Sequence, residues 1–252
     1  MSEEKGKEIT KLHASEATQS WLTKGFEKAL EAQLPLAVST VSRLRRVHPE
    51  KSPKQLIDSL SKWYIGVVAG SGASAGLAST VPNGFVQAPV ALTDLTAFFE
   101  ASVLYVLTAA EIYDVDVEDL ERRRFLVMTA LLGNTGTTTV TQALGKRTVP
   151  YWSKQIINRI PMQAINQANK VLGTRFITKY GTRQGVLVLG KQLPLTLGAV
   201  VGASGNAAFG YAIVRSTKKV LGTPPENWSP SPDDTGQAPD SPVTSDVETE
   251  AN

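Results

Sequence analysis

Apolar residues in the first part of the chain recur every three to four positions, which predicts helices rather than strands. A first amphipathic helix is expected to end at Leu34, directly before Pro35, and residues 1–14 are polar and expected to fray. A second short helix over 36–47 ends in three arginines, Arg43, Arg45 and Arg46. The pattern therefore predicts a helical hairpin within residues 1–50.

The rest of the folded part also follows helical spacing, with proline and glycine between the elements. Ser52 and Pro53 indicate a helix start, because proline suits the first turn of a helix. After a turn at 82–84, further helices are expected at 89–113 and 120–132, then a loop at 133–139, then two or three short helices up to 180, separated by Pro150, Pro161 and Gly173.

Two long segments carry no charged residue: 63–93, with 31 residues, and 192–214, with 23. Glycines four positions apart in both would let helix backbones approach closely, and they predict a glycine-rich helical hairpin. A spanning helix needs about 20 apolar residues, so both are long enough, but Ser, Thr, Asn, Gly and Pro dilute their hydropathy. Three interpretations stay open: spanning helices, a buried hairpin that can touch or enter a bilayer, and ordinary core.

The predicted architecture is all-α, a compact multi-helix bundle. It has a polar segment and hairpin at 1–50, a helical domain at 51–222, and an acidic tail at 223–252. The tail is rich in Pro, Ser, Asp and Glu, and it is expected to be disordered because it cannot bury enough apolar surface.

Composition narrows the function classes. The 252-residue chain has no cysteine, which excludes disulfides, thiolate metal sites and a cysteine nucleophile. No apolar run typical of a secretory signal lies in residues 1–20, so no export by that route is expected.

Charge is segregated along the chain. Residues 122–225 hold 15 Lys and Arg and no Asp or Glu, whereas 226–252 hold seven acidic residues and no basic one. The basic stretch must find anions in the N-terminal half, the tail, phospholipid headgroups or nucleic acid. The candidate contacts with anionic lipid are Arg122, Arg123, Arg124, Lys146, Arg147 and Lys154, of which the first three are expected on the exposed side of their helix.

Recognisable catalytic chemistry is missing from the sequence. His13 and His48 have no metal-ligand or triad partners at suitable spacing. Asp94 and Glu100 point to different sides of one helix, and Glu111 lies roughly 16 Å further along it than Glu100, so no carboxylate pair forms there. We predict no catalytic residue, metal or cofactor, although a hydrolase that uses Asp94 stays an alternative.

Several segments resemble one known family when they are taken in order. They are 76–82, 89–94, 109–116, 121–125, 131–133, 165–169, 189–194 and 197–206. Together they look like the EcsC family over about residues 54–222. In that family a small-residue hairpin ends in a proline turn, and a helix with an early aspartate, a tyrosine-containing helix end and an Arg-rich helix follow. The best-matched or candidate positions here are Pro82, Asp94, Glu100, Tyr113, Lys191, Pro194, Gly202 and Asn206.

The resemblance implies a membrane-associated accessory protein of the bacterial cell envelope, with a link to ABC-type export and no assigned activity. Its expected partners are an anionic membrane surface or a membrane protein, or a second copy through the small-residue helices. The expected place is the cytoplasmic side of the membrane, with the cytoplasm as the alternative. A soluble scaffold and an uncharacterised hydrolase are the competing functions, and nucleic acid is not expected.

Overall fold

Helices account for nearly all of the structure. The computed structural model describes residues 2–78, 84–144, 160–190 and 195–228, with side chains within 19–70, 96–142, 160–180 and 205–228 apart from that of Trp21. These residues form seven helices and no strand, which confirms the all-α prediction. The helices are α1 (Ser2–Val47), α2 (Pro53–Ala78), α3 (Gly84–Ile112), α4 (Leu120–Leu132), α5 (Asn134–Leu144), α7 (Met162–Gly190) and α8 (Leu195–Leu221).

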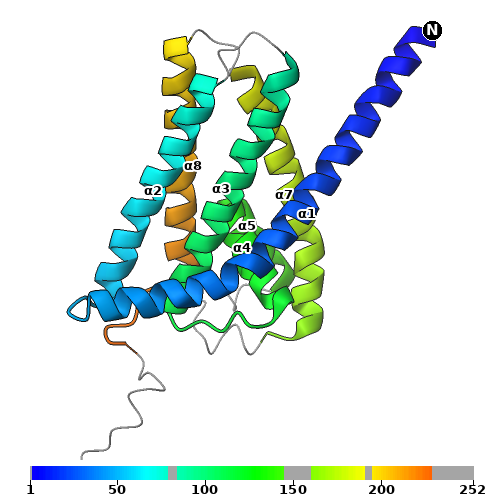
Figure 1. The fold of residues 1–252 in the computed structure, drawn as a ribbon. Coiled ribbons are helices and arrows are strands. Elements are labelled where there is room, and N and C mark those ends of the chain that lie inside the picture. The colour runs from blue at the N-terminus through cyan, green and yellow to red at the C-terminus, as the bar shows by residue number, and fades with distance from the viewer. Residues whose placement is uncertain (1, 79–83, 145–159, 191–194, 229–252) are drawn as a thin grey trace, which may run out of the picture.

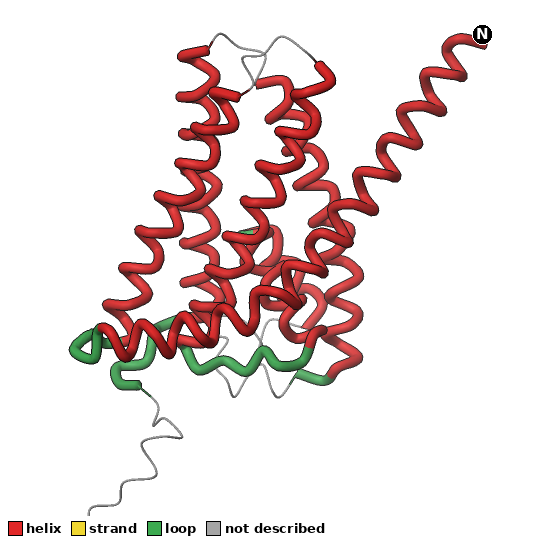
Figure 2. Tube along the Cα trace, in the orientation of Figure 1, coloured by secondary structure: helices red, strands yellow, loops and turns green. Residues whose placement is uncertain are grey.

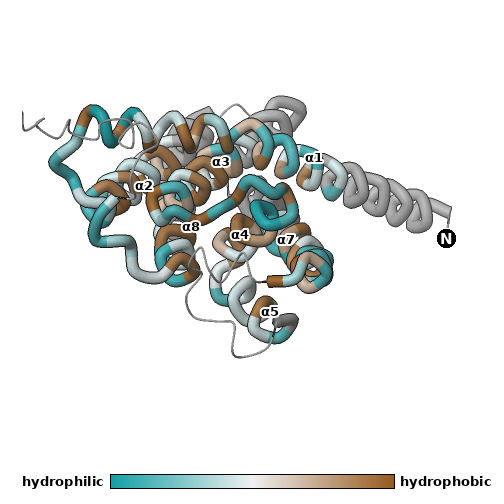
Figure 3. The backbone as a smooth tube through the Cα atoms, turned by 90° about the horizontal axis from the view of Figure 1, so that it is seen from below, coloured by the Kyte–Doolittle hydropathy of each residue, from teal (hydrophilic) through white to brown (hydrophobic). Residues whose placement is uncertain are grey.

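The long helices α2, α3, α7 and α8 run side by side, and the C-terminal half of α1 crosses one end of them (Figure 1). The most extensive pairings are α2 with α8 and α1 with α3, while α4, α5 and α7 pack on one another. Figure 3 shows apolar positions gathering where α2, α3, α4 and α8 face one another. Helices α1, α2, α3, α4, α7 and α8 all contribute buried side chains to one core, among them Leu30, Tyr64, Val106, Phe125, Phe176 and Ile213.

The hairpin predicted within residues 1–50 is wrong, because α1 is one continuous helix that includes Pro35 and residues 2–14. Pro35 is exposed, so the carbonyl group that it leaves without an N–H partner can meet water. Leu30 and Ala37, on either side of the proline, are both buried in the core, and breaking the helix would displace one of them. Figure 2 shows α1 changing direction part-way along its length, as a helix with an internal proline does.

Two helix starts follow the sequence closely. At the start of α2, Ser52 N–H donates to Gln55 Oε1 at 2.9 Å, and Gln55 N–H donates to Ser52 Oγ at 3.3 Å, a reciprocal capping box. Asp119 accepts from the Arg122 N–H at 2.9 Å and starts α4, which ends at Gly133 with a positive φ of 68°. By contrast, α3 begins at Gly84, five residues before the expected start at Pro89.

The loop expected at 133–139 is also wrong, since α5 begins at Asn134. Its threonine hydroxyls donate back to carbonyl groups one turn earlier, for example Thr139 Oγ1 to Thr135 O at 2.8 Å. Gly136 lets α5 pack closely on α4, because a Cβ there would lie 2.5 Å from the Thr129 carbonyl oxygen. Gly173 does not break the chain either, since α7 passes through it and buries Leu172 and Phe176.

The two uncharged segments meet where α2 packs against α8. The close approach is at Gly210, where a Cβ would lie 2.7 Å from Val68 Cγ2. Gly66 and Gly70, which the four-residue spacing favoured for this role, face open space. Within the described residues, no helix combines the length and apolar character that crossing a membrane requires.

The segment after α8 packs against the bundle beyond residue 222, where the disordered tail was expected to begin. Trp228 donates its Nε1–H to the Lys51 carbonyl oxygen at 3.0 Å, and the Arg45 guanidinium lies 4.8 Å from the centre of its ring. The tail predicted from residue 223 is therefore ordered up to Trp228, and its remainder, 229–252, lies outside the described residues.

Candidate functional site

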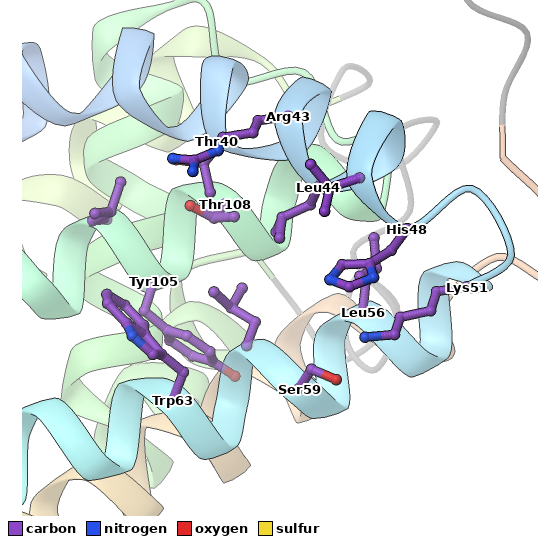
Figure 4. A pocket seen from close by; sticks show the side chains of 13 residues that line it. Thr40, Arg43, Leu44, His48, Lys51, Leu56, Ser59, Trp63, Tyr105 and Thr108 are labelled. Atoms are coloured by element: carbon purple, nitrogen blue, oxygen red, sulfur yellow. The ribbon is translucent and has the colours of Figure 1, made fainter.

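A groove of about 530 Å³ lies between the C-terminal part of α1, the first half of α2, and α3 (Figure 4). Its lining is mainly apolar, with Leu44 from α1, Leu56 and Leu60 from α2, and Leu104 and Tyr105 from α3. Trp63 stands at its edge with 55% of its surface exposed. Because the three helices come from separate parts of the sequence, the groove exists only in the folded chain.

Basic side chains border the groove near the end of α1 and the start of α2. Arg43 lies in the last turns of α1, and His48 and Lys51 lie in the connection to α2 (Figure 4). Basic residues suit the C-terminal end of a helix, where the backbone carbonyls carry partial negative charge. We call Arg43, Arg46 and Lys51 the basic corner. None of the three forms an ion pair within the described part of the chain, whereas His48 Nδ1 lies 3.5 Å from a Glu50 carboxylate oxygen.

The wall formed by α2 and α3 is fixed by buried polar contacts. The Tyr105 and Ser61 hydroxyls are 3.0 Å apart, and the Tyr64 and Ser102 hydroxyls are 2.7 Å apart. The Tyr64 and Tyr105 rings stack with their centroids 4.5 Å apart. Burial raises the pKa of Tyr105 above its ordinary range, so this phenol stays neutral and keeps its hydrogen bond. The wall is therefore preformed.

Thr108 is the exception among these polar groups. Its side chain lines the groove and is 0% exposed, yet its hydroxyl has no hydrogen-bond partner within the described residues. Most buried side-chain hydroxyls are hydrogen-bonded, because leaving one without a partner costs about 1–3 kcal/mol. A hydroxyl of this kind on a groove wall suits a ligand with an acceptor atom.

The lining of the groove can bind a molecule through both apolar and charged contacts. It combines an apolar wall, cations on one side and a hydroxyl, and no carboxylate is among its lining residues. Within the described residues, no group of three or more His, Asp or Glu side chains could hold a metal ion.

The arginine cluster predicted to contact lipid is largely built into the fold. Arg123 is 7% exposed, and it donates to the carbonyl oxygens of Val117 at 2.9 Å, Leu30 at 3.0 Å and Glu118 at 2.9 Å. The expectation that Arg123 lies on the exposed side of its helix is wrong. It can be buried because these three carbonyl oxygens accept the hydrogen bonds that water would otherwise accept. Burial lowers the pKa of its guanidinium, an effect that the nearby charge of Glu118 opposes.

The two neighbouring arginines are half-buried and also have partners in the fold. Arg124 pairs with Glu121 at 2.6 Å and with Glu27 of α1 at 3.1 Å. Arg122 donates to the Ile160 carbonyl oxygen at 3.3 Å. The cluster thus ties α4 to α1 and to the residues before α7. The other three expected lipid contacts, Lys146, Arg147 and Lys154, lie outside the described residues.

The residues singled out by the family resemblance do not form one site. Pro82, Lys191 and Pro194 lie outside the described residues. Asp94 and Gly202 are described only by their backbones, which belong to α3 and α8. The positions with described side chains are Glu100, Tyr113 and Asn206.

Those three positions lie apart from the groove. Glu100 is exposed on α3, and Asn206 is fully buried in α8. The Tyr113 hydroxyl donates to the Gly222 carbonyl oxygen at 3.3 Å and joins the ends of α3 and α8. Burial raises the pKa of Tyr113 to about 12, so it remains a neutral donor. Tyr113 and Asn206 therefore lie in contacts that support the fold.

The three arginines at the end of the second predicted helix are visible in the sequence, but the sequence alone does not predict a site there. The available signal was their position at a helix end, followed within a few residues by His48 and Lys51. What the sequence could not indicate is the apolar groove beside them, which needs α3.

Comparison with known proteins adds no assignment, since the chain matches no family model, no curated protein and no solved structure. The resemblance to the EcsC family is therefore neither supported nor contradicted, and it stays a prediction.

Proposed function

We propose that this protein attaches peripherally to an anionic membrane surface through the basic corner. The observation that carries the proposal is that Arg43, Arg46 and Lys51 have no ion pair within the described residues, although the other arginine cluster is occupied by the fold. Each cation close to an anionic surface contributes about 1 kcal/mol, so three cations give substantial, salt-sensitive attraction.

Exposed apolar side chains beside the cations support the same proposal. Val47 is 60% exposed between Arg46 and His48, and Trp63 is 55% exposed at the groove. Aromatic and aliphatic side chains next to cations suit the boundary between headgroups and acyl chains. The resemblance to the EcsC family is the reason to place this surface at the cytoplasmic face of a bacterial envelope, beside an ABC-type exporter.

Sedimentation with vesicles tests the proposal. The full chain should bind vesicles that contain phosphatidylglycerol, release them at high salt, and ignore vesicles of phosphatidylcholine alone. Replacing Arg43, Arg46 and Lys51 together by serine should weaken binding about 100-fold, because roughly 3 kcal/mol of attraction is lost.

A matched variant controls for charge alone. Lys170, Arg215 and Lys219 are also exposed cations without an ion pair within the described residues, but they lie on α7 and α8. Replacing these three by serine changes the net charge equally and should weaken binding far less. Equal losses in the two variants would show that no particular surface attaches, and no binding by the full chain would overturn the proposal.

A further inference from the structure

We propose that the groove between α1, α2 and α3 binds one single-chain amphiphile with an anionic head, such as a long-chain carboxylate. Its volume of about 530 Å³ lies within the range of roughly 300–1,000 Å³ that is usual for small-molecule sites. The site takes a free molecule, so it goes beyond attachment to a membrane surface. The two proposals share Arg43, Lys51 and Trp63, and the test therefore relies on other residues.

The chemistry of the lining is divided between two sides. Figure 4 shows Arg43 on α1, His48 just after the end of α1 and Lys51 beside the first turn of α2, with Trp63 and Tyr105 on the walls formed by α2 and α3. An acyl chain would lie against the leucines and the aromatic rings, while its charged head would lie among the cations. A neutral amphiphile would leave the cations unused, and a small anion without a chain would leave the apolar wall unused.

Thr108 gives an independent indication of a ligand. Its hydroxyl is fully buried in the groove wall and has no hydrogen-bond partner within the described residues, and Figure 4 shows it facing α1, the helix that carries Arg43. A carboxylate that sits between Thr108 and Arg43 would accept a hydrogen bond from the hydroxyl and pair with the guanidinium. One head group would thus satisfy both side chains.

The acidic tail is the competing occupant. Trp228 directly precedes the tail and donates to the carbonyl oxygen of Lys51, a residue that lines the groove. Residues 229–252 hold six side-chain carboxylates. The tail brings carboxylates but few apolar side chains, with Val243 and Val247 its only large aliphatic residues. The apolar wall therefore favours an acyl chain.

Isothermal titration of the full chain with sodium dodecanoate, below its micelle concentration, tests the proposal. We expect saturable binding at one site, and affinity that falls by up to about fourfold for each CH2 group removed from the chain. Sodium butanoate and the neutral dodecyl glucoside should bind at least tenfold more weakly. The absence of saturable dodecanoate binding, or equal binding of either control compound, would overturn the proposal.

The variant Thr108→Val separates ligand binding from folding. It keeps the shape of the side chain and removes the hydroxyl, so dodecanoate affinity should fall about tenfold while the melting temperature does not fall. Thr129→Val is the control: Thr129 is equally buried, but its hydroxyl donates to the Phe125 carbonyl oxygen at 2.7 Å. It should lower the melting temperature and leave dodecanoate affinity unchanged. Unchanged affinity in Thr108→Val would overturn the proposal.

Two further measurements keep the proposals apart. Thr108→Val should bind anionic vesicles as the unaltered chain does, because Thr108 is buried. If the unaltered chain binds dodecanoate but not vesicles, only membrane attachment is rejected.

A second measurement identifies the occupant of the groove. If dodecanoate binds only after Asp233→Asn and Asp234→Asn are introduced, the tail occupies the groove and the amphiphile is rejected as its ordinary occupant.

Discussion

The chain contains two clusters of three arginines, and the fold treats them differently. Arg122, Arg123 and Arg124 on α4 point to carbonyl and carboxylate oxygens of neighbouring segments. Arg43 and Arg46 on α1 lie at the protein surface without an ion pair within the described residues. A run of charges in a sequence therefore does not indicate whether those charges remain available to a partner.

The physical cause is what each cluster faces. The α4 cluster follows the acidic segment 114–121 and lies against α1, so carboxylates and backbone carbonyls of neighbouring segments surround it. The α1 cluster ends a helix at the edge of the bundle, where the turn to α2 and the groove are its neighbours. Buried arginines need such partners, because an unpaired buried charge is very costly.

The largest expected effect comes from removing the buried arginine. Arg123→Met should lower the free energy of unfolding by about 3 kcal/mol, because three carbonyl oxygens lose a charged donor. Urea unfolding monitored by circular dichroism measures this. Arg46→Met is the matched change in the other cluster, and it should stay within about 0.5 kcal/mol of the unaltered chain. A similar loss in both variants would contradict the comparison.

The sequence was most informative where local chemistry decides the structure. Asp119 and Gly133 delimit α4, and Ser52, Pro53 and Gln55 start α2, because caps act within a few residues. It was least informative where distant packing outweighs a local preference. A proline inside a helix costs about 3 kcal/mol on its own, and burial of the residues around Pro35 offsets that cost only in the assembled bundle.

The candidate site follows the same rule. Arg43, His48 and Lys51 are visible in the sequence as a basic run, but the groove beside them depends on α3, which begins more than 30 residues later. The role of Arg123 depends on the Leu30 carbonyl oxygen, 93 residues away in the chain. Neither the groove nor the hydrogen bond from Arg123 to Leu30 produces a periodic or local pattern in the sequence, so neither could be predicted from one sequence.

A smaller effect is expected at Asp58, which occupies two cations that would otherwise be available. Its carboxylate lies 2.7 Å from Lys218 Nζ and 2.9 Å from Lys54 Nζ, and hydrogen bonds from Lys218 and then Lys54 lower its pKa below the ordinary value. Asp58→Asn should cost less than about 1 kcal/mol at neutral pH, because the pair is partly exposed to solvent. It should strengthen vesicle binding slightly, since it releases Lys54, which lies close in the chain to Lys51 of the basic corner.

The pH dependence of this change has a definite sign. Because the pKa of Asp58 is lowered on folding, its contribution is fully present above the pKa of the unfolded chain, about 3.9, and is lost as the pH falls through the lower folded value. Melting temperatures of the unaltered chain and Asp58→Asn should therefore differ at pH 7 and converge as the pH falls through the lowered pKa of Asp58. A difference that grows on acidification would contradict the assigned ion pairs.

The smallest expected effect concerns Arg45, which lies between Arg43 and Arg46 but stacks on Trp228. Arg45→Ala should cost about 0.5 kcal/mol and shift the fluorine resonance of a 5-fluorotryptophan at position 228, because the cation over the ring is lost. It should weaken vesicle binding less than Arg46→Ala, which in turn should leave that resonance in place. If Arg45→Ala weakened vesicle binding as much as Arg46→Ala, Arg45 would belong to the lipid contact, and anchoring of Trp228 could not be its main role.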